Sequence, residues 1–262
     1  MNFLAHFGEL AIRRFVAIRH LAAVSVAVLR AAIHPRQWSP SVRTVFARQI
    51  LFTGVEAVPF VSLMAVTIGI LVVLQAQVWL NRFGQSNLVG PILVFIILRA
   101  AGPLLTNFVV IGRSGSAITT ELANMKVSGE IDLLDAQGID PFVYLVVPRA
   151  LSTALCVFCL AIVFTFVSLL TGYVLGFFVG GGSPGSGALF ADVLRAIHPV
   201  DVFNLMAMTL VPGLMTGIIC VISGLSVGSS VTDVPQAVSR GVMGSVAALF
   251  VTLAIVSLLT YF

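Results

Sequence analysis

The sequence predicts an all-α integral membrane protein with an N-terminal interfacial helix and five transmembrane helices. Of its 262 residues, 59% are hydrophobic and 9% are charged, and the mean hydropathy is +1.11, so too few polar side chains exist to cover a water-soluble globule. Uncharged runs occupy residues 57–81, 150–191, 202–232 and 241–262, and Arg99 is the only charge in residues 83–112. Each run can hold the ~20 apolar residues of a membrane-spanning helix. A secreted disulfide scaffold, a nucleic-acid-binding domain and a disordered chain are excluded, because the first needs more than three cysteines and the others need more charge.

Residues 1–48 predict a basic amphipathic segment that lies in the headgroup layer. They hold seven arginines against one acid, Glu9, so they carry a formal charge of +6, which places the N-terminus in the cytoplasm. Phenylalanines and leucines recur near helical spacing between the arginines. The apolar stretch at residues 21–33 contains Arg30 and is too short to span a bilayer, and no convincing cleavage site follows it, so a signal peptide is rejected. The alternative is a solvated basic tail.

The five spans are predicted at about residues 57–80, 88–112, 145–179, 202–225 and 241–262. Starting from an inside N-terminus, eleven of the fourteen lysines and arginines fall on the cytoplasmic side and only Arg82 and Arg195 fall outside, so the C-terminus is expected outside.

The second outer loop contains residues 180–187, GGGSPGSG, which are typical of a turn, and residues 188–200, which could form a short helix that stops before Pro199. No internal repeat indicates an inverted-repeat carrier.

Charged residues after position 48 cluster in the inner segment, residues 112–149. Gly112 and Gly115 permit a tight exit from the second span, residues 119–134 have a helix-compatible composition, and Asp140-Pro141 starts a new helix. A helix with an apolar stripe ringed by charges can cap its own bundle or dock into a soluble partner, and composition alone favours neither.

This inner segment reads G-R-x-G-x-A-x-x-x-E-L-x-x-M-x-V, followed by E-I-D-x-L, G-x-D-P and Y-L-V-x-P-R. The pattern resembles the signature of the MlaE (YrbE) family of ABC-type lipid permeases. The resemblance extends back to Leu74-Gln75 and weakly forward through residues 228–240, so it covers roughly residues 50–262. The matching residues of the inner segment are Gly112, Arg113, Gly115, Ala117, Glu121, Leu122, Met125, Val127, Glu130, Ile131, Asp132, Leu134, Gly138, Asp140, Pro141, Tyr144, Leu145, Val146, Pro148 and Arg149.

The resemblance implies a permease domain at residues 49–262 that follows the interfacial segment, and a cytoplasmic coupling helix between spans 2 and 3. Its implied partners are a second copy of the chain, a dimer of ABC ATPase subunits, a hexameric ring of MCE-domain subunits, often a STAS-domain protein, and phospholipid, with no nucleic acid. It implies transport between the bacterial inner membrane and the periplasm, as in systems that maintain outer-membrane asymmetry. The residues that it assigns to ATPase coupling are Arg113, Glu121, Leu122, Met125, Glu130 and Asp132.

ATP binding by this chain itself is not expected. A P-loop needs a lysine after its glycine-rich turn, and the only lysine, Lys126, follows Asn124-Met125 instead. We therefore predict no cofactor in this chain, with ATP and Mg²⁺ held by the separate ATPase.

Arg99 is the main candidate for lipid binding. In mid-membrane its insertion costs ~2.5–3.5 kcal/mol unless it meets a polar group. A guanidinium can bind a phosphate through two N–H groups, which favours a headgroup contact, and the alternative is an arginine held by backbone carbonyls or by a polar partner on another helix. Members of the MlaE family commonly have Glu directly after this Arg, whereas this chain has Ala100. With no carboxylate beside it, Arg99 is expected to take its counter-charge from a lipid phosphate.

Four more residues complete the candidate lipid site. Gly102-Pro103 is expected to loosen the second span beside Arg99 and open a polar-lined cavity. Gln75 and Trp79 lie in the outer half of the first span, although a Trp there is more typical of an interfacial belt.

Other chemistries are less favoured by the sequence. The cysteines at positions 156, 159 and 220 lie in apolar spans, which favours packing over redox chemistry, and the four histidines have no metal-ligand spacing, so no metal is predicted. Residues 112–115 match the G-x-S-G of serine proteases, but no predicted span holds a histidine or lysine to activate Ser114. A passive membrane scaffold would explain a docking helix but not Arg99.

Overall fold

The computed structural model describes residues 19, 21–32, 40–82, 92–179, 199–228 and 230–261, and in these ranges no residue belongs to a β-strand. Five helical stretches are long and apolar enough to cross a membrane. They are Pro40–Ala76, Val94–Val127, Phe142–Leu175, Pro199–Leu225 and Val231–Thr260. The prediction of an all-α membrane protein with five spans is confirmed.

Most of these stretches consist of several elements, because the hydrogen-bond pattern of the helix changes along them. Short 3-10 turns occur at η2 and η7, and π-helical turns occur at η4, η5 and η6. In chain order the elements are α2 Pro40–Thr53, η2 Val55–Ala57, α3 Val58–Arg82, η4 Val94–Ala101, α5 Gly102–Val110, η5 Ile111–Gly115, α6 Ser116–Val127, α7 Glu130–Ala136, η6 Phe142–Val146, α8 Val147–Val179, α10 Pro199–Leu225, η7 Val231–Asp233 and α11 Val234–Tyr261.

Several helices begin earlier than the charge pattern predicts. α2 begins at Pro40, inside the segment predicted to be interfacial, and α10 begins at Pro199. The predicted turn at 180–187, most of the predicted helix at 188–200 and the side chain of Trp79 lie outside the described residues.

The second stretch differs most from the prediction. Gly112 and Gly115 do not end the span, because the chain continues through them as η5 and α6 to Val127. Gly115 serves close packing instead: a Cβ there would lie 3.0 Å from the Sγ of Cys220 on α10. The single helix predicted over 119–134 is two helices, α6 and α7, separated at Gly129, whose φ of +74° lies in the left-handed region that glycine adopts without strain.

A π-helical turn precedes Gly102-Pro103, as a loosened span requires. Pro103 has no N–H to donate and its ring clashes with the carbonyl four residues back, which is that of Arg99. The N–H of Gly102 accordingly donates to the carbonyl of Ile97, five residues back. Arg99 therefore lies in a distorted turn, η4, rather than in a regular α-helix.

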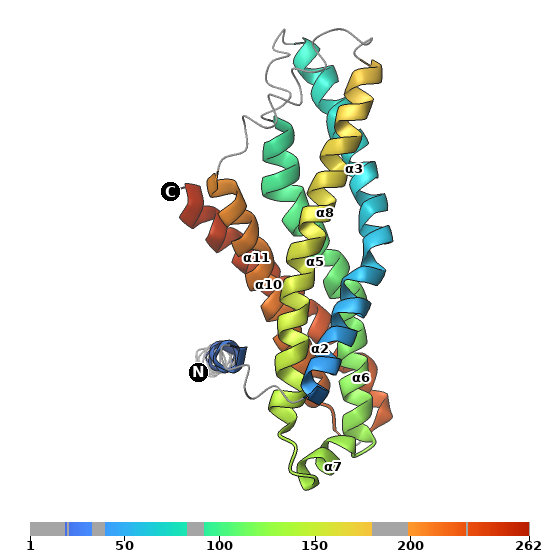
Figure 1. Ribbon diagram of the computed structural model, residues 1–262, viewed down its shortest axis with the longest axis vertical. Helices are drawn as coiled ribbons and strands as arrows, with labels where there is room; N and C mark the ends of the chain where they lie inside the picture. The colour runs from blue at the N-terminus through green and yellow to red at the C-terminus, as the bar shows by residue number, and fades with distance from the viewer. Residues whose placement is uncertain are drawn as a thin grey trace, which may run out of the picture.

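α8 and α10 form the centre of the bundle. α8 packs along α3 and α10, and α10 also packs against α11 and α6 (Figure 1). Small residues allow the close approaches: a Cβ on Gly217 of α10 would lie 2.6 Å from the Cα of Ala150 on α8.

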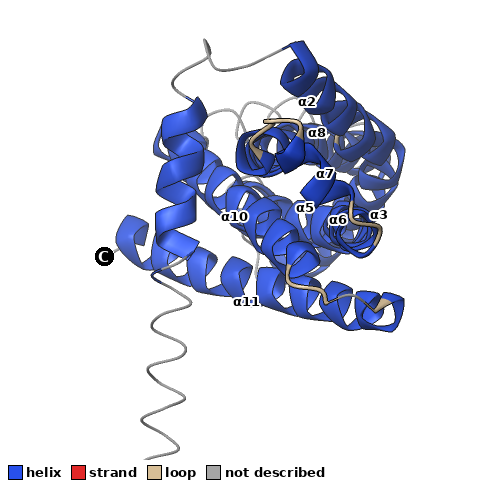
Figure 2. Ribbon diagram, turned by 90° about the horizontal axis from the view of Figure 1, so that it is seen from below, coloured by secondary structure: helices blue, strands red, loops and turns tan. Residues whose placement is uncertain are grey.

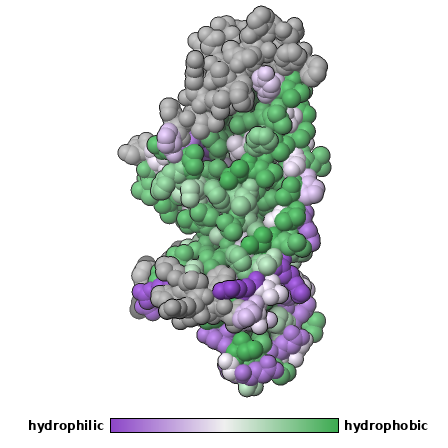
Figure 3. Space-filling model, in the orientation of Figure 1, coloured by the Kyte–Doolittle hydropathy of each residue, from purple (hydrophilic) through white to green (hydrophobic). Residues whose placement is uncertain are grey.

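The N-terminal helix, Leu21–Ala32, lies across the long axis of the bundle. Figure 1 shows it end-on and Figure 2 shows it from the side. Val28 is buried against the bundle, and Ser25 contacts the sulfur of Met215 at 3.8 Å. A broad apolar surface covers the middle of the molecule, and polar residues gather at the end that carries α7 (Figure 3).

Candidate functional site

An ion pair joins span 2 to span 4. Arg99 on η4 approaches Asp201, in the first turn of α10, with Nε 2.6 Å from Oδ1, and Nη2 donates to Oδ2 at 3.1 Å. The side chain of Asp201 is 4% exposed and that of Arg99 is 24% exposed. The ion pair therefore contains one charge-assisted hydrogen bond, from Nη2, and a second close approach of opposite charges at Nε.

The expectation that no carboxylate lies near Arg99 is therefore wrong. Asp201 supplies the counter-charge, because α10 begins three residues before the predicted span and brings the carboxylate to Arg99. The carboxylate lies 102 residues away in the chain, so the sequence neighbourhood of Arg99 does not reveal it.

A second polar contact lies on the same pair of helices. The side-chain amide of Asn107, fully buried on α5, donates to the carbonyl of Pro103 at 2.7 Å and to that of Met208 on α10 at 3.3 Å. Sequence reasoning missed Asn107, and the signal that could have found it is an amide inside an apolar span, which must be hydrogen-bonded.

Two other members of the predicted lipid site, Gly102 and Pro103, are packed inside the bundle. Gly102 and Pro103 are buried, and a Cβ on Gly102 would lie 3.2 Å from the Oγ1 of Thr165 on α8, so they shape the helix rather than line a cavity. Gln75 is exposed on α3 and forms no hydrogen bond within the described part of the chain.

Three ion pairs lie toward the end of the molecule that carries α6 and α7. Arg149 donates from Nη2 to Glu121 at 2.7 Å, and Lys126 lies 3.4 Å from Asp132. Arg113 donates to Glu56 at 2.8 Å, between η5 and η2, and its guanidinium lies 5.3 Å from the ring centre of Phe52.

Of the residues predicted to contact an ATPase, Leu122 is not at the surface. It is 0% exposed, because it packs where Gly224 of α10 approaches α6, and we reassign it to the core. Glu121, Glu130 and Asp132 are exposed, whereas Met125 and Arg113 are half-buried.

Comparison with known protein families shows to which family this chain belongs. The family model described as "Permease MlaE" matches residues 46–259. This chain belongs to the MlaE permease family.

Curated relatives extend the comparison over most of the chain. The chain is 26% identical to the "Probable ABC transporter permease protein RC0129" of Rickettsia conorii, over 93% of this chain and 92% of that protein. It is 28% identical to the permease protein slr1045 of a Synechocystis strain, over 78% and 77% of the two chains. It is 26% identical to the "Intermembrane phospholipid transport system permease protein MlaE" of Haemophilus influenzae, over 71% and 70%.

The family and the five spans make the chain a multi-pass inner-membrane permease subunit that is not itself catalytic. The hydroxyl of Ser114 is buried in η5 and has no hydrogen-bond partner among the residues described.

The cysteine predictions have mixed outcomes. Cys156 is buried against Gly54: a Cβ on that glycine would lie 3.0 Å from the Sγ of Cys156. Cys220 is buried beside Ser245, so both cysteines pack as predicted. Cys159 is exposed on the outside of α8 instead.

Proposed function

We propose that this MlaE-family chain is the permease subunit of an ATP-driven phospholipid transporter that works with an MCE-domain protein between the bacterial inner membrane and the periplasm. The observation that carries the proposal is the Arg99–Asp201 pair inside a permease of this family. The similarity to the Haemophilus influenzae protein, which is named as a phospholipid transport permease, supports the substrate class.

Arg99 is the proposed contact for the lipid phosphate. Asp201 offsets much of the cost of keeping a guanidinium in the membrane and fixes its orientation. Because the Arg99 side chain remains 24% exposed, a phosphate can approach it from the open side while Asp201 holds the other. Gly102 and Pro103 contribute to lipid binding indirectly, because they cause the π-helical turn that contains Arg99. Gln75 and Trp79 are proposed to line the path of the lipid on span 1.

The α6–α7 end is the proposed ATPase contact. Glu130 and Asp132 are exposed on α7, and Leu133, which follows Asp132, is 59% exposed, which gives a charged surface with an apolar side chain beside it. The Lys126–Asp132 pair would transmit movement of α7 to α6. The Glu121–Arg149 and Arg113–Glu56 pairs would transmit it further to spans 3 and 1, and Met125 would do so through its packing against the core. ATP and Mg²⁺ would be bound by the ATPase.

The proposed assembly contains two copies of this chain, two ATPase subunits, a hexameric MCE ring and, in some complexes, a STAS-domain protein. The helix Leu21–Ala32 would lie in the cytoplasmic headgroup layer, with the N-terminus in the cytoplasm and the C-terminus in the periplasm.

Native mass spectrometry of the detergent-extracted complex tests this proposal, because it reads partner subunits and bound lipid together. We expect masses that correspond to an ATPase dimer, an MCE oligomer and retained phospholipid. A complex that holds this chain with no ATPase and no lipid would refute the proposal.

A further inference from the structure

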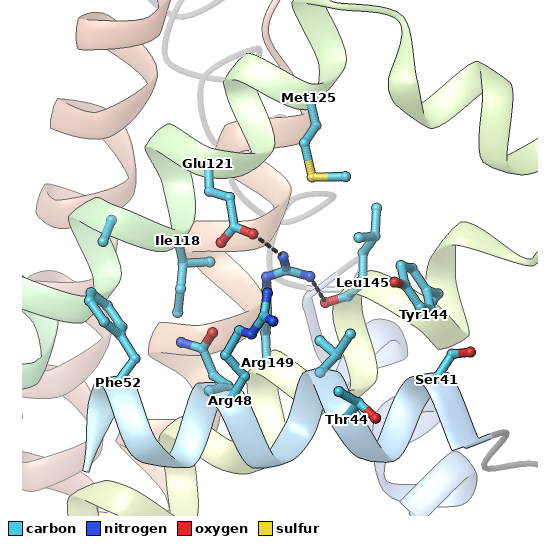
Figure 4. Close-up of a pocket in the computed structure, with 13 residues that line it drawn as sticks. Ser41, Thr44, Arg48, Phe52, Ile118, Glu121, Met125, Tyr144, Leu145 and Arg149 are labelled. Atoms are coloured by element: carbon cyan, nitrogen blue, oxygen red, sulfur yellow. Dashed lines mark hydrogen bonds and ion pairs between the residues drawn. The ribbon is translucent and has the colours of Figure 1, made fainter. Parts of the chain in front are cut away.

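A cavity of about 700 Å³ lies between α2, α6 and the η6–α8 junction, at the end of the molecule away from Arg99. Figure 4 shows Arg48 and Phe52 from α2, Glu121 and Met125 from α6, and Arg149 around it. Arg99 and Glu121 belong to one helical run and are separated by 22 residues, roughly 30 Å of helix, so this cavity is distinct from the Arg99 site.

The two arginines of the cavity are only partly matched by acceptors. Arg149 is 4% exposed; its Nη2 and Nη1 donate to Glu121 and to the carbonyl of Leu145, but its Nε has no hydrogen-bond partner among the residues described. Arg48, on the facing helix, has no acidic partner within the described ranges. Two guanidiniums therefore face one carboxylate, and a buried donor without an acceptor is unfavourable.

Apolar side chains line the cavity around these charges. They are Val45 and Phe52 from α2, Ile118 from α6 and Leu145 from η6. Two of the elements that line the cavity, α2 and α6, lie toward the end of the molecule at which polar residues gather (Figures 1 and 3). A ligand with an anionic group and an adjoining apolar part fits this arrangement better than a free anion does.

We propose that this cavity binds the phosphate group of an anionic phospholipid from the leaflet next to α6 and α7, with Arg48 and Arg149 as the phosphate contacts. The site is separate from the lipid path at Arg99 and does not require that the chain transport lipid. Its lipid contacts Glu121 and Met125, so occupancy changes the surroundings of the segment that leads into α7.

Lipid titration of the delipidated full-length chain, read by native mass spectrometry with phosphatidylglycerol, tests the proposal. Arg48→Gln should weaken the tightest binding class by about tenfold, the loss expected for one charge-assisted contact. The matched control is Arg43→Gln, an exposed arginine on the same helix that does not line the cavity, and it should leave binding within about twofold of the parent. Equal losses in both variants would show a general charge effect, and no loss in either would also overturn the proposal.

Ala117→Phe supplies a test without a change of charge, because it fills the cavity from α6. It should reduce phosphatidylglycerol binding as Arg48→Gln does, and unchanged binding in a folded Ala117→Phe protein would contradict the site. Inorganic phosphate is titrated in parallel: Arg48-dependent binding of phosphate without lipid binding would assign the cavity to a soluble anion. All titrations are repeated with the Arg99→Ala protein. Any lipid that this variant still binds is not bound at Arg99, so the effect of Arg48→Gln on the cavity can be measured separately.

Discussion

The Arg99–Asp201 pair should couple the stability of span 2 to that of span 4. Removal of one partner from a fully buried ion pair costs about 3–5 kcal/mol. Because the Arg99 side chain is 24% exposed, we expect a smaller loss, about 2–3 kcal/mol, for Asp201→Asn, which leaves a guanidinium that cannot lose its charge. Arg99→Gln should cost less, since the carboxyl of Asp201 can take up a proton and become neutral.

A double-mutant cycle measures this coupling. The unfolding free energies of the parent, both single variants and the Arg99→Gln/Asp201→Asn protein are determined in mixed micelles titrated with sodium dodecyl sulfate. We expect the double variant to be more stable than the sum of the single losses predicts, with an interaction free energy of about 2 kcal/mol. Additive losses, within about 0.5 kcal/mol, would show that the pair does not link the two spans.

Three further predictions concern packing, topology and coupling. Gly217→Leu should destabilise the protein by about 1–3 kcal/mol, because a Cβ at Gly217 already contacts Ala150. The control, Gly112→Leu, should have little effect, because no atom lies within 4 Å of the Cβ position of Gly112. Equal unfolding free energies of the two variants would contradict the α8–α10 contact. In spheroplasts, an N-terminal tag should be protected from external protease and a C-terminal tag cleaved, and equal protection of both would mean that a span is miscounted. Glu130→Lys with Asp132→Lys should reduce copurification of the ATPase with the chain while monodispersity is kept, and unchanged copurification would remove α7 from the ATPase contact.

The sequence was sufficient for the number and approximate position of the spans. A bilayer sets the minimum apolar length of a helix, so uncharged runs reveal spans without knowledge of their contacts. The signature around Glu121 was equally informative, and it identified the family that the comparison over residues 46–259 then showed.

The contacts of the site could not be predicted in the same way. Asp201 lies on a different span from Arg99, and only the packing of α10 against span 2 brings the two side chains together. Gly115 was interpreted as an exit from the helix, but in a packed bundle a glycine also lets a neighbouring helix approach, and the sequence does not distinguish these uses. Leu122 was assigned to the surface for the same reason, because the burial of α6 against α10 and α11 is a tertiary property.

The central claim, phospholipid transport through a path that contains Arg99, is tested most directly by ATP-dependent lipid transfer in proteoliposomes. The parent, Arg99→Ala and Arg99→Lys are each reconstituted with the cognate ATPase and MCE protein, and transfer of fluorescent phospholipid to the MCE protein is followed after ATP is added. We expect the alanine variant to assemble and lose at least about tenfold in transfer rate, and the lysine variant to recover part of it, because an ammonium keeps the charge but not the bidentate geometry. Transfer at the parental rate by an assembled Arg99→Ala complex would contradict the account.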